Sequence, residues 1–298
     1  IDFINNSVQD CPNIFFLSME ISDNVRKYRP YLESYFHDHR IKKNNFFTDI
    51  SNYLAYEIGQ PTHCYDMNKI HHPIEFNNIF VKEEFHSLIG KKIQLNQKNC
   101  VFTSNNEIIN LAGIMGGIST ACNENTSKVL IESAYFNAEA IIGKSLKYDI
   151  HSDASYKYER GIDPSLQEIA LRRFIKIVSD HTEIIKLKIY REQKLGIDKK
   201  NIEFDSNMIN KILGTEISKD NIEKSLSSIG FIINGSSLEV PKHRHDIKHL
   251  NDIAEEVARV IGYDHIKPKK FLIKDKSNTL KQKEDYIKDF LVDNGFNE

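Results

Sequence analysis

The sequence predicts an α+β protein in which a mixed, β-rich domain with packed helices precedes a small winged-helix-like domain. Three observations predict this class. Short apolar runs typical of strands are interleaved with segments of helical periodicity over residues 1–190. Residues 191–200 have the polar composition of a linker. Residues 201–268 follow the order helix, helix, hairpin, as in winged-helix-like modules.

Composition limits the class of protein. A hydrophobic fraction of 40% with 10% aromatic residues supports a buried core, and 298 residues suffice for one large domain or two. The net charge of −2 gives no global attraction to nucleic acid, so any RNA contact must be local. The four cysteines form no CxxC pair, which favours a reduced, cytoplasmic setting. The sequence shows neither a membrane-spanning run nor a signal-peptide pattern.

The first part of the chain predicts a buried strand at 14–21 and an amphipathic helix at 28–37. His37 and His39 stand two residues apart. On a helix they would point in different directions, so we do not expect them to bind a metal together.

A second helix, predicted over 50–58, introduces the first group of polar side chains. Pro61 forces extended backbone after this helix and presents His63 from a loop. Because Ser51 and Asn52 are predicted near the helix start, their side chains could meet His63 in space. Each has a structural alternative: Asn52 could cap the helix, and His63 could be a hydrogen-bonded structural histidine.

Residues 74–135 are predicted to be rich in strands, at 77–82, 91–95, 99–102, 107–111 and 129–135. The glycines at 113, 116 and 117 match no phosphate-binding motif, so they either let backbone approach a ligand or form a tight turn. Glu132 lies among apolar residues of the last strand. Because a buried acid without a partner is costly, Glu132 either faces solvent or serves a site.

The stretch HSDASYKYERG at 151–161 carries too few apolar residues to build a core. Ser152 is predicted to cap a helix that starts at Asp153 and to aim N–H groups and a hydroxyl at whatever lies in front. The alternative is a solvated helix start with ion pairs such as Glu159 with Arg160. The neighbouring elements are predicted as helices at 138–148 and 164–180 and a strand at 184–190.

The second domain is predicted to contain helices at 207–213 and 219–228 and a hairpin with an Asn-Gly turn at 234–235. Such modules often bind nucleic acid. This one has no concentrated basic stripe on its second helix, so docking to a protein is an equal alternative.

An acidic helix face follows. Asp252, Glu255, Glu256 and Arg259 occupy positions i, i+3, i+4 and i+7, with Asp246 just upstream. Like charges so placed repel, and Mg²⁺ would relieve the repulsion. The alternative is a solvated acidic face partly paired with Arg259. A basic linker at 267–283 then leads into a helical pattern at 286–292.

Taken together, these motifs resemble the β subunit of bacterial phenylalanyl–tRNA synthetase. The matching runs are DISNYLAYEIGQPTHCYD at 49–66, AGIMGG and VLIESAYF within 112–136, HSDASYKYERGIDP at 151–164 and DIKHLNDIAEEVARVIGYDHI at 246–266. They cover nearly the whole chain in the same order.

The resemblance implies an editing domain at 1–190 that hydrolyses tyrosine mischarged onto phenylalanine tRNA. A linker at 191–200, a winged-helix-like, Mg²⁺-binding domain at 201–268 and the start of a further, truncated domain at 269–298 would follow. It also implies an α₂β₂ heterotetramer whose α subunit binds ATP and performs aminoacylation. The chain is therefore expected to be a fragment of a cytoplasmic, tRNA-binding ligase subunit.

The resemblance also implies roles for individual residues. Glu132 would read the para-hydroxyl of tyrosine, because phenylalanine would leave a buried acceptor unpaired. His63 and Asn52 would position the hydrolytic water. The pocket would be shaped by Ser51, Ser152 and Ala154, substrate admitted by Gly113, Gly116 and Gly117, and Mg²⁺ bound by Asp246, Asp252, Glu255 and Glu256.

The chain departs from the family pattern at several positions. Serine replaces the usual threonine at 51 and 152, lysine replaces arginine at 42 and 157, and Thr120-Ala121 replaces Ser-Gly. Lysine cannot reproduce the bidentate fork of arginine. A rival hypothesis is therefore a non-catalytic scaffold that docks the α subunit and RNA. A metal-dependent winged-helix DNA binder is a third, which the near-neutral charge disfavours.

Overall fold

The computed structural model describes residues 1–196, 200–267 and 283–296, which form two compact units. The first unit comprises Ile1–Phe204 and Ile229–His249, and the second comprises the described part of Asp205–Ser228 and Leu250–Glu298. Helices and strands are both abundant, so the predicted α+β class is confirmed. No described helix has the length and apolar character needed to cross a membrane.

The strands of the first unit are β1 (Phe3–Asn5), β2 (Asn13–Ile21), β3 (His63–Asp66), β4 (Ile74–Val81), β5 (Glu84–His86), β6 (Lys92–Gln94), β7 (Gln97–Ser104), β8 (Glu107–Leu111), β9 (Met115–Gly116), β10 (Lys128–Tyr135), β11 (Ile184–Gln193), β12 (Lys200–Glu203), β13 (Ile232–Asn234) and β14 (Ser237–Val240). Its helices are α1 (Pro30–Asp38), α2 (Phe46–Glu57), α3 (Ala138–Ile141), α4 (Lys144–Tyr148), α5 (Asp153–Arg160) and α6 (Gln167–Ser179), with 3₁₀ turns η1 (Met67–Lys69) and η2 (Ile118–Thr120).

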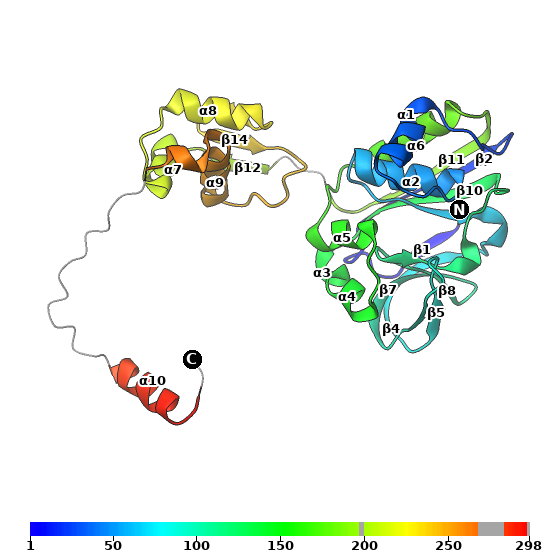
Figure 1. Ribbon diagram of the computed structural model, residues 1–298, viewed down its shortest axis with the longest axis horizontal. Coiled ribbons are helices and arrows are strands. Elements are labelled where there is room, and N and C mark those ends of the chain that lie inside the picture. The colour runs from blue at the N-terminus through cyan, green and yellow to red at the C-terminus, as the bar shows by residue number, and fades with distance from the viewer. Residues whose placement is uncertain (197–199, 268–282, 297–298) are drawn as a thin grey trace. The chain divides into compact units, whose positions relative to one another are not determined.

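Two sheets organise this unit. A five-stranded sheet has the order β1-β4-β7-β8-β9, and a four-stranded sheet has the order β11-β2-β10-β3. Helices α1, α2 and α6 cover one face of the four-stranded sheet (Figure 1). Its other face packs on the five-stranded sheet. Smaller sheets are formed by β5-β6 and by β12-β14-β13.

The strand β2 is apolar without alternation because both of its faces are buried. Phe15 and Leu17 pack in the core beneath the helices, whereas Ile14 and Phe16 pack in the core between the sheets. The neighbouring strand β10 divides its side chains in the same way. Glu132 lies on the same face of β10 as Leu130 and Ala134, which pack between the two sheets, so its side chain faces that space.

Several predicted elements are confirmed with small shifts of their ends. The strand predicted at 14–21 is β2, that at 129–135 is β10, and Ser152 caps α5. The helix α2 is followed by Gly59, which has φ +79°. The Asn-Gly turn joins β13 to β14, with φ +64° at Gly235.

Two predictions about the segment around His63 are wrong. His63 is not in a loop but is the first residue of β3, because pairing with β10 extends the sheet by one strand. The helix α2 starts at Phe46, where Asn45 accepts a hydrogen bond from the backbone N–H of Thr48. Ser51 and Asn52 are therefore in the middle of α2, and Asn52 does not cap it.

The helical segments around α5 also differ from prediction. The single helix expected at 138–148 is interrupted at Gly143, whose φ of +75° breaks it into α3 and α4. The helix expected from Pro164 begins only at Gln167 as α6.

The second unit contains α7 (Ser206–Leu213), α8 (Lys219–Ser228), α9 (Leu250–Ile261), η3 (Tyr263–His265) and α10 (Lys283–Asp293). Asp205 caps α7 by accepting from the N–H groups of Asn207 and Met208. Helices α7 and α8 each pack against α9, and apolar residues such as Ile222 and Ile253 are buried. The predicted linker at 267–283 lies mostly outside the described residues, and the predicted domain boundaries stay a prediction.

Candidate functional site

A cavity of about 490 Å³ opens in the first unit beside β3, the edge strand of the four-stranded sheet. Its walls come from α2, from the glycine segment 113–116, from Leu88 and Ile89 at the tip of the β5–β6 hairpin, and from the start of α5. Eight of the nine residues predicted to act in editing line it: Ser51, Asn52, His63, Gly113, Gly116, Glu132, Ser152 and Ala154. The ninth, Gly117, does not line the cavity.

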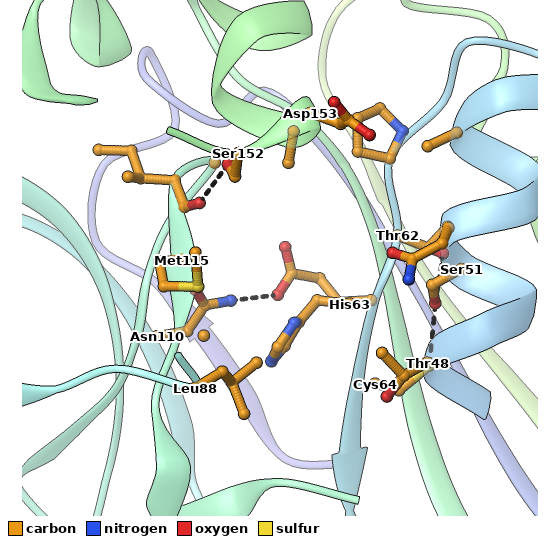
Figure 2. A pocket seen from close by; sticks show the side chains of 18 of the residues that line it. Thr48, Ser51, Thr62, His63, Cys64, Leu88, Asn110, Met115, Ser152 and Asp153 are labelled. Atoms are coloured by element: carbon orange, nitrogen blue, oxygen red, sulfur yellow. Dashed lines mark hydrogen bonds between the residues drawn. The ribbon is translucent and has the colours of Figure 1, made fainter. Parts of the chain in front are cut away.

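Figure 2 shows the labelled side chains on three sides of this cavity. Ser51 and Thr62 lie on one side, Asn110 and Met115 on the opposite side, and Ser152 with Asp153 at one end. His63 projects between the two sides (Figure 2). The cavity therefore gathers polar side chains from segments that are far apart in the sequence.

Glu132 and His63 are held side by side by strand register. They stand directly opposite each other in the antiparallel pairing of β10 with β3, so their side chains emerge on the same face. Only 4% of Glu132 is exposed. The alternative that Glu132 faces bulk solvent is therefore wrong.

Glu132 has two hydrogen-bond donors. The Tyr65 hydroxyl donates to Oε2 at 2.5 Å, and the Asn110 amide donates to the same oxygen at 3.2 Å. Burial raises the pKa of Glu132 from 4.5 to about 7, although both hydrogen bonds act to lower it. At neutral pH the carboxyl group is thus divided between its charged and neutral forms.

His63 carries a neutral imidazole at neutral pH, because burial lowers its pKa to about 4. The ring makes an edge-to-face contact with Tyr65, with centroids 4.4 Å apart. It also lies against Gly116, where a Cβ atom would come within 2.1 Å of Cε1. Within the described residues the ring nitrogens have no hydrogen-bond partner, so both are available to a ligand or a water.

The glycines serve packing as well as access. A Cβ atom on Gly117 would meet the Ile109 carbonyl oxygen at 2.8 Å, and Gly113 has φ +70° with side chains closely packed around it. Gly116 alone makes room for His63. The close approach at Gly116 thus serves His63 of the same chain, and the admission of substrate by these glycines stays a prediction.

The polar residues on α2 differ in their availability. Ser51 is buried, its hydroxyl accepts from Thr62 at 2.9 Å, and it lies 3.1 Å from the Cys64 sulfur. Asn52 is exposed, and its side-chain amide makes no hydrogen bond with a described residue. Asn52 can therefore bind a ligand or water without breaking an existing contact.

The start of α5 is tied to the glycine segment. The Ser152 hydroxyl donates to the Ile114 carbonyl at 2.7 Å and accepts from the Ser155 N–H at 3.0 Å. The Ser152 hydroxyl therefore caps α5 as predicted and also fixes the cavity wall. Glu159 accepts from Ser145 at 2.7 Å, and no ion pair joins it to Arg160 in the described structure.

The predicted Mg²⁺ ligands do not form a recognisable metal site within the described residues. No group of three or more His, Cys, Asp or Glu side chains in the described part of the chain is placed to hold a metal ion. Glu256 is buried and paired with Arg259, whereas its neighbour Glu255 is exposed because adjacent helix positions point in different directions. Asp246 is paired with Arg244. The residues thus do not fit the ion as arranged, and Mg²⁺ stays a prediction for Asp246, Asp252, Glu255 and Glu256.

Sequence reasoning missed Tyr65 and Asn110. A strand signal would have found Tyr65, because residues 63 and 65 of one strand share a face. The proline at position 61 instead indicated a loop at Thr62 and His63, which hides this strand period. Asn110 stands as a polar residue in an apolar strand, as Glu132 does, and could have been found by the same argument.

Glutamine at position 132 is expected to make stability less dependent on pH. The folded pKa of Glu132 is about 7 against 4.5 for an ordinary glutamate, so between these values the folded chain keeps a proton that the unfolded chain has lost. Stability therefore falls as pH rises through this window, by about 3 kcal/mol. We therefore expect the free energy of unfolding of Glu132→Gln, measured with urea, to rise by about 3 kcal/mol relative to that of wild type between pH 4.5 and 8.

The matched control is Glu57→Gln. Its ion pair with Arg173 lowers the pKa of Glu57, so the loss of Glu57 should destabilise the chain more as pH rises. The contribution of His63 is common to all three proteins and cancels in the differences. A difference between wild type and Glu132→Gln that is constant with pH would contradict the buried position of Glu132.

Comparison with known proteins gives two domain families. The B3/4 domain family matches residues 10–183, and the tRNA synthetase B5 domain family matches residues 202–263. Curated relatives carry the name phenylalanine–tRNA ligase β subunit. One from Pseudoalteromonas translucida is 32% identical over 226 residues, covering 73% of this chain and 28% of the relative. One from Clostridium tetani is 32% identical over 270 residues, which cover 87% of this chain and 34% of the relative.

The chain spans about a third of the length of these relatives. Among solved structures, an N-terminal fragment of the phenylalanyl–tRNA synthetase β subunit from Pyrococcus horikoshii has a TM-score of 0.40 and 14% identity, covering 88% of this chain and 74% of that one. That likeness is too distant to bear on the site.

Proposed function

Because the chain belongs to the B3/4-domain family of phenylalanine–tRNA ligase β subunits, we propose that its first unit is an editing hydrolase that removes tyrosine mischarged onto phenylalanine tRNA. The observation that supports this most is the pairing of buried Glu132 with neutral His63 in one cavity. One group is suited to a phenol and the other to a hydrolytic water.

The carboxyl group of Glu132 provides the proposed selectivity. A tyrosine side chain brings a hydroxyl that can donate to Glu132 once the cavity excludes water. A phenylalanine ring would cover the same carboxyl group and give it no partner, which is costly for a buried acceptor. The substrate that differs by one hydroxyl is thus retained, and the correct amino acid is rejected.

His63 and Asn52 provide the proposed hydrolysis. The aminoacyl ester is already activated, so a water held in the attacking position and a polarised carbonyl suffice for most of the rate. Water adds to the ester carbonyl, the bond from the carbonyl carbon to the ribose oxygen breaks, and free tyrosine and a ribose hydroxyl result. Neutral His63 can take the proton from the water and return it to the leaving oxygen.

The wider role follows from the family. We propose that the longer protein pairs with an α subunit, which would bind ATP and charge phenylalanine tRNA, in an α₂β₂ assembly. Magnesium binding by the acidic residues near α9 belongs to the same proposal.

The rival function is a non-catalytic scaffold of the same fold. It is favoured by the hydroxyls of Ser51 and Ser152, which are both engaged within the chain. Such a protein would dock the α subunit and RNA without hydrolysis.

Incubation of the chain with tyrosine-charged phenylalanine tRNA separates these functions. The hydrolase should release tyrosine at least about 100-fold faster than phenylalanine from the correctly charged tRNA, since both acyl groups share one tRNA and differ by one hydroxyl. Acid precipitation of labelled tRNA measures both rates. A time course that matches spontaneous hydrolysis for both substrates would refute the hydrolase and leave the scaffold.

A further inference from the structure

Three side chains form a closed set of hydrogen bonds at the wall of the cavity, which Glu132 and Asn110 line. The Tyr65 hydroxyl donates to Glu132 Oε2 at 2.5 Å. The Asn110 amide donates both to that hydroxyl, at 2.8 Å, and to the same Oε2, at 3.2 Å. Tyr65 is fully buried and does not line the cavity, so it contacts the carboxyl group from behind.

The two oxygens of Glu132 therefore differ. Oε2 accepts two hydrogen bonds from the protein, whereas no donor from the described residues reaches Oε1. Because Glu132 itself lines the cavity, Oε1 is the oxygen left for a ligand. The two donors also resist rotation of the carboxyl group, which would exchange the two oxygens.

We propose that Tyr65 and Asn110 are positioning residues that anchor one oxygen of Glu132 and so present the other to the phenol of a bound tyrosine. This inference rests on the proposed function and names what determines its selectivity. Tyr65 offers a phenol of its own from the side opposite the ligand. The carboxyl group would thus be clamped between an internal and an incoming phenol.

The same donors maintain the charge of Glu132. Both favour the ionised form, against the effect of burial. Besides Tyr65, four titratable groups lie around it in the described structure: His63 and Cys64 on β3, Cys11 before β2 and Tyr158 on α5. Burial lowers the pKa of His63, so its imidazole supplies no positive charge at neutral pH. Burial raises the pKa values of Cys64, Cys11 and Tyr158, so these groups stay neutral and add no negative charge. Among the described groups around Glu132, only the hydrogen bonds from Tyr65 and Asn110 therefore favour the ionised carboxylate, which is the better hydrogen-bond acceptor.

The molecule contains a matched pair for comparison. Tyr148 and Asn99 are also buried, and the amide of Asn99 exchanges hydrogen bonds with the Tyr148 hydroxyl at 3.0 and 3.1 Å. No carboxyl group takes part, and neither residue lines the cavity. Tyr148→Phe thus removes a buried hydroxyl from an amide without touching Glu132.

The test compares wild type, Tyr65→Phe, Asn110→Ser and Tyr148→Phe in the full chain. Release of tyrosine and of phenylalanine from charged phenylalanine tRNA is measured from pH 6 to 9, and the ¹³C resonance of the Glu132 carboxyl group is titrated. We expect Tyr65→Phe to lower the tyrosine-to-phenylalanine ratio about 10-fold at pH 7, to raise the carboxyl midpoint by about one unit and to recover part of the ratio at pH 9. Asn110→Ser should shift the ratio and the carboxyl midpoint in the same directions, but by smaller amounts.

Other outcomes separate the hypotheses. The positioning role would be overturned if folded Tyr65→Phe kept the wild-type tyrosine-to-phenylalanine ratio and the wild-type carboxyl midpoint. It would also be overturned if Tyr148→Phe lowered the ratio as much as Tyr65→Phe does. If Tyr65→Phe does not fold, Asn110→Ser decides by the same two measurements. A wild type without preference for tyrosine would instead refute the proposed function, and the carboxyl titration would still report whether Tyr65 anchors Glu132.

Discussion

Replacing Glu132 with alanine is expected to lower the rate of tyrosine release from mischarged phenylalanine tRNA by about 100-fold. A hydrogen bond to a charged group contributes about 1.5–3 kcal/mol, which corresponds to a factor of roughly 10 to 150. The upper part of this range applies because the carboxyl group is buried and its orientation is fixed. Steady-state kinetics with labelled tyrosyl-tRNA measure the change as kcat/KM.

The effect should be specific to the hydroxyl. Release of phenylalanine should stay slow or increase slightly, because alanine removes the carboxyl group that an aromatic ring would otherwise leave unpaired. Glu132→Gln keeps an acceptor and should lose less than alanine does. Glu57→Gln, which alters a surface ion pair with Arg173, is the control and should retain the wild-type rate. Equal losses for both amino acids would show that Glu132 supports the fold and does not select the substrate.

Part of this cavity could be predicted from local sequence. The position of Glu132 among apolar residues of a strand leaves two alternatives, exposure to solvent or service in a site, and the structure shows it buried. The cap at Ser152 and the turn at Gly59 follow from residue types with known backbone preferences. Each of these inferences needs only neighbours in the sequence.

The contacts within the cavity could not be predicted in this way. His63 follows a proline and a threonine, so its segment looked like a loop, and only pairing with β10 makes it a strand. The same pairing brings His63 opposite Glu132, which is 69 residues away in the numbering. The cap prediction placed the Ser152 hydroxyl at the start of α5, but it did not identify the carbonyl of Ile114 as the group that accepts from it. Strand partners and hydrogen-bond partners from distant segments decide such details.

The acidic residues near α9 show the limit of spacing arguments. A periodicity of three and four residues places side chains on one broad face, but it does not distinguish an exposed Glu255 from a buried Glu256. The alternative interpretation was an acidic face partly paired with Arg259, and the structure shows this pairing at Glu256.

Joint replacement of His63 and Asn52 by alanine is expected to lower kcat for tyrosine release by about 1,000-fold and to leave KM nearly unchanged. Neither side chain contacts Glu132 through a hydrogen bond, so recognition of the phenol should persist while the water loses its orientation. Positioned donors and general bases each contribute roughly 100-fold or more, and residues that act on one water are not additive.

The single variant His63→Gln distinguishes orientation of water from proton transfer. Glutamine can still hold a water, but it cannot accept a proton, so a residual rate within about 10-fold of wild type would indicate orientation. The pH profile gives an independent criterion. Because the pKa of His63 is about 4, the histidine stays neutral from pH 5 to 9 and should add no inflection there. An inflection near pH 7 should come from Glu132 and should vanish in Glu132→Gln. If it remains in Glu132→Gln and is lost in His63→Gln, the imidazole titrates in that range and the assignment of the two groups must be reversed.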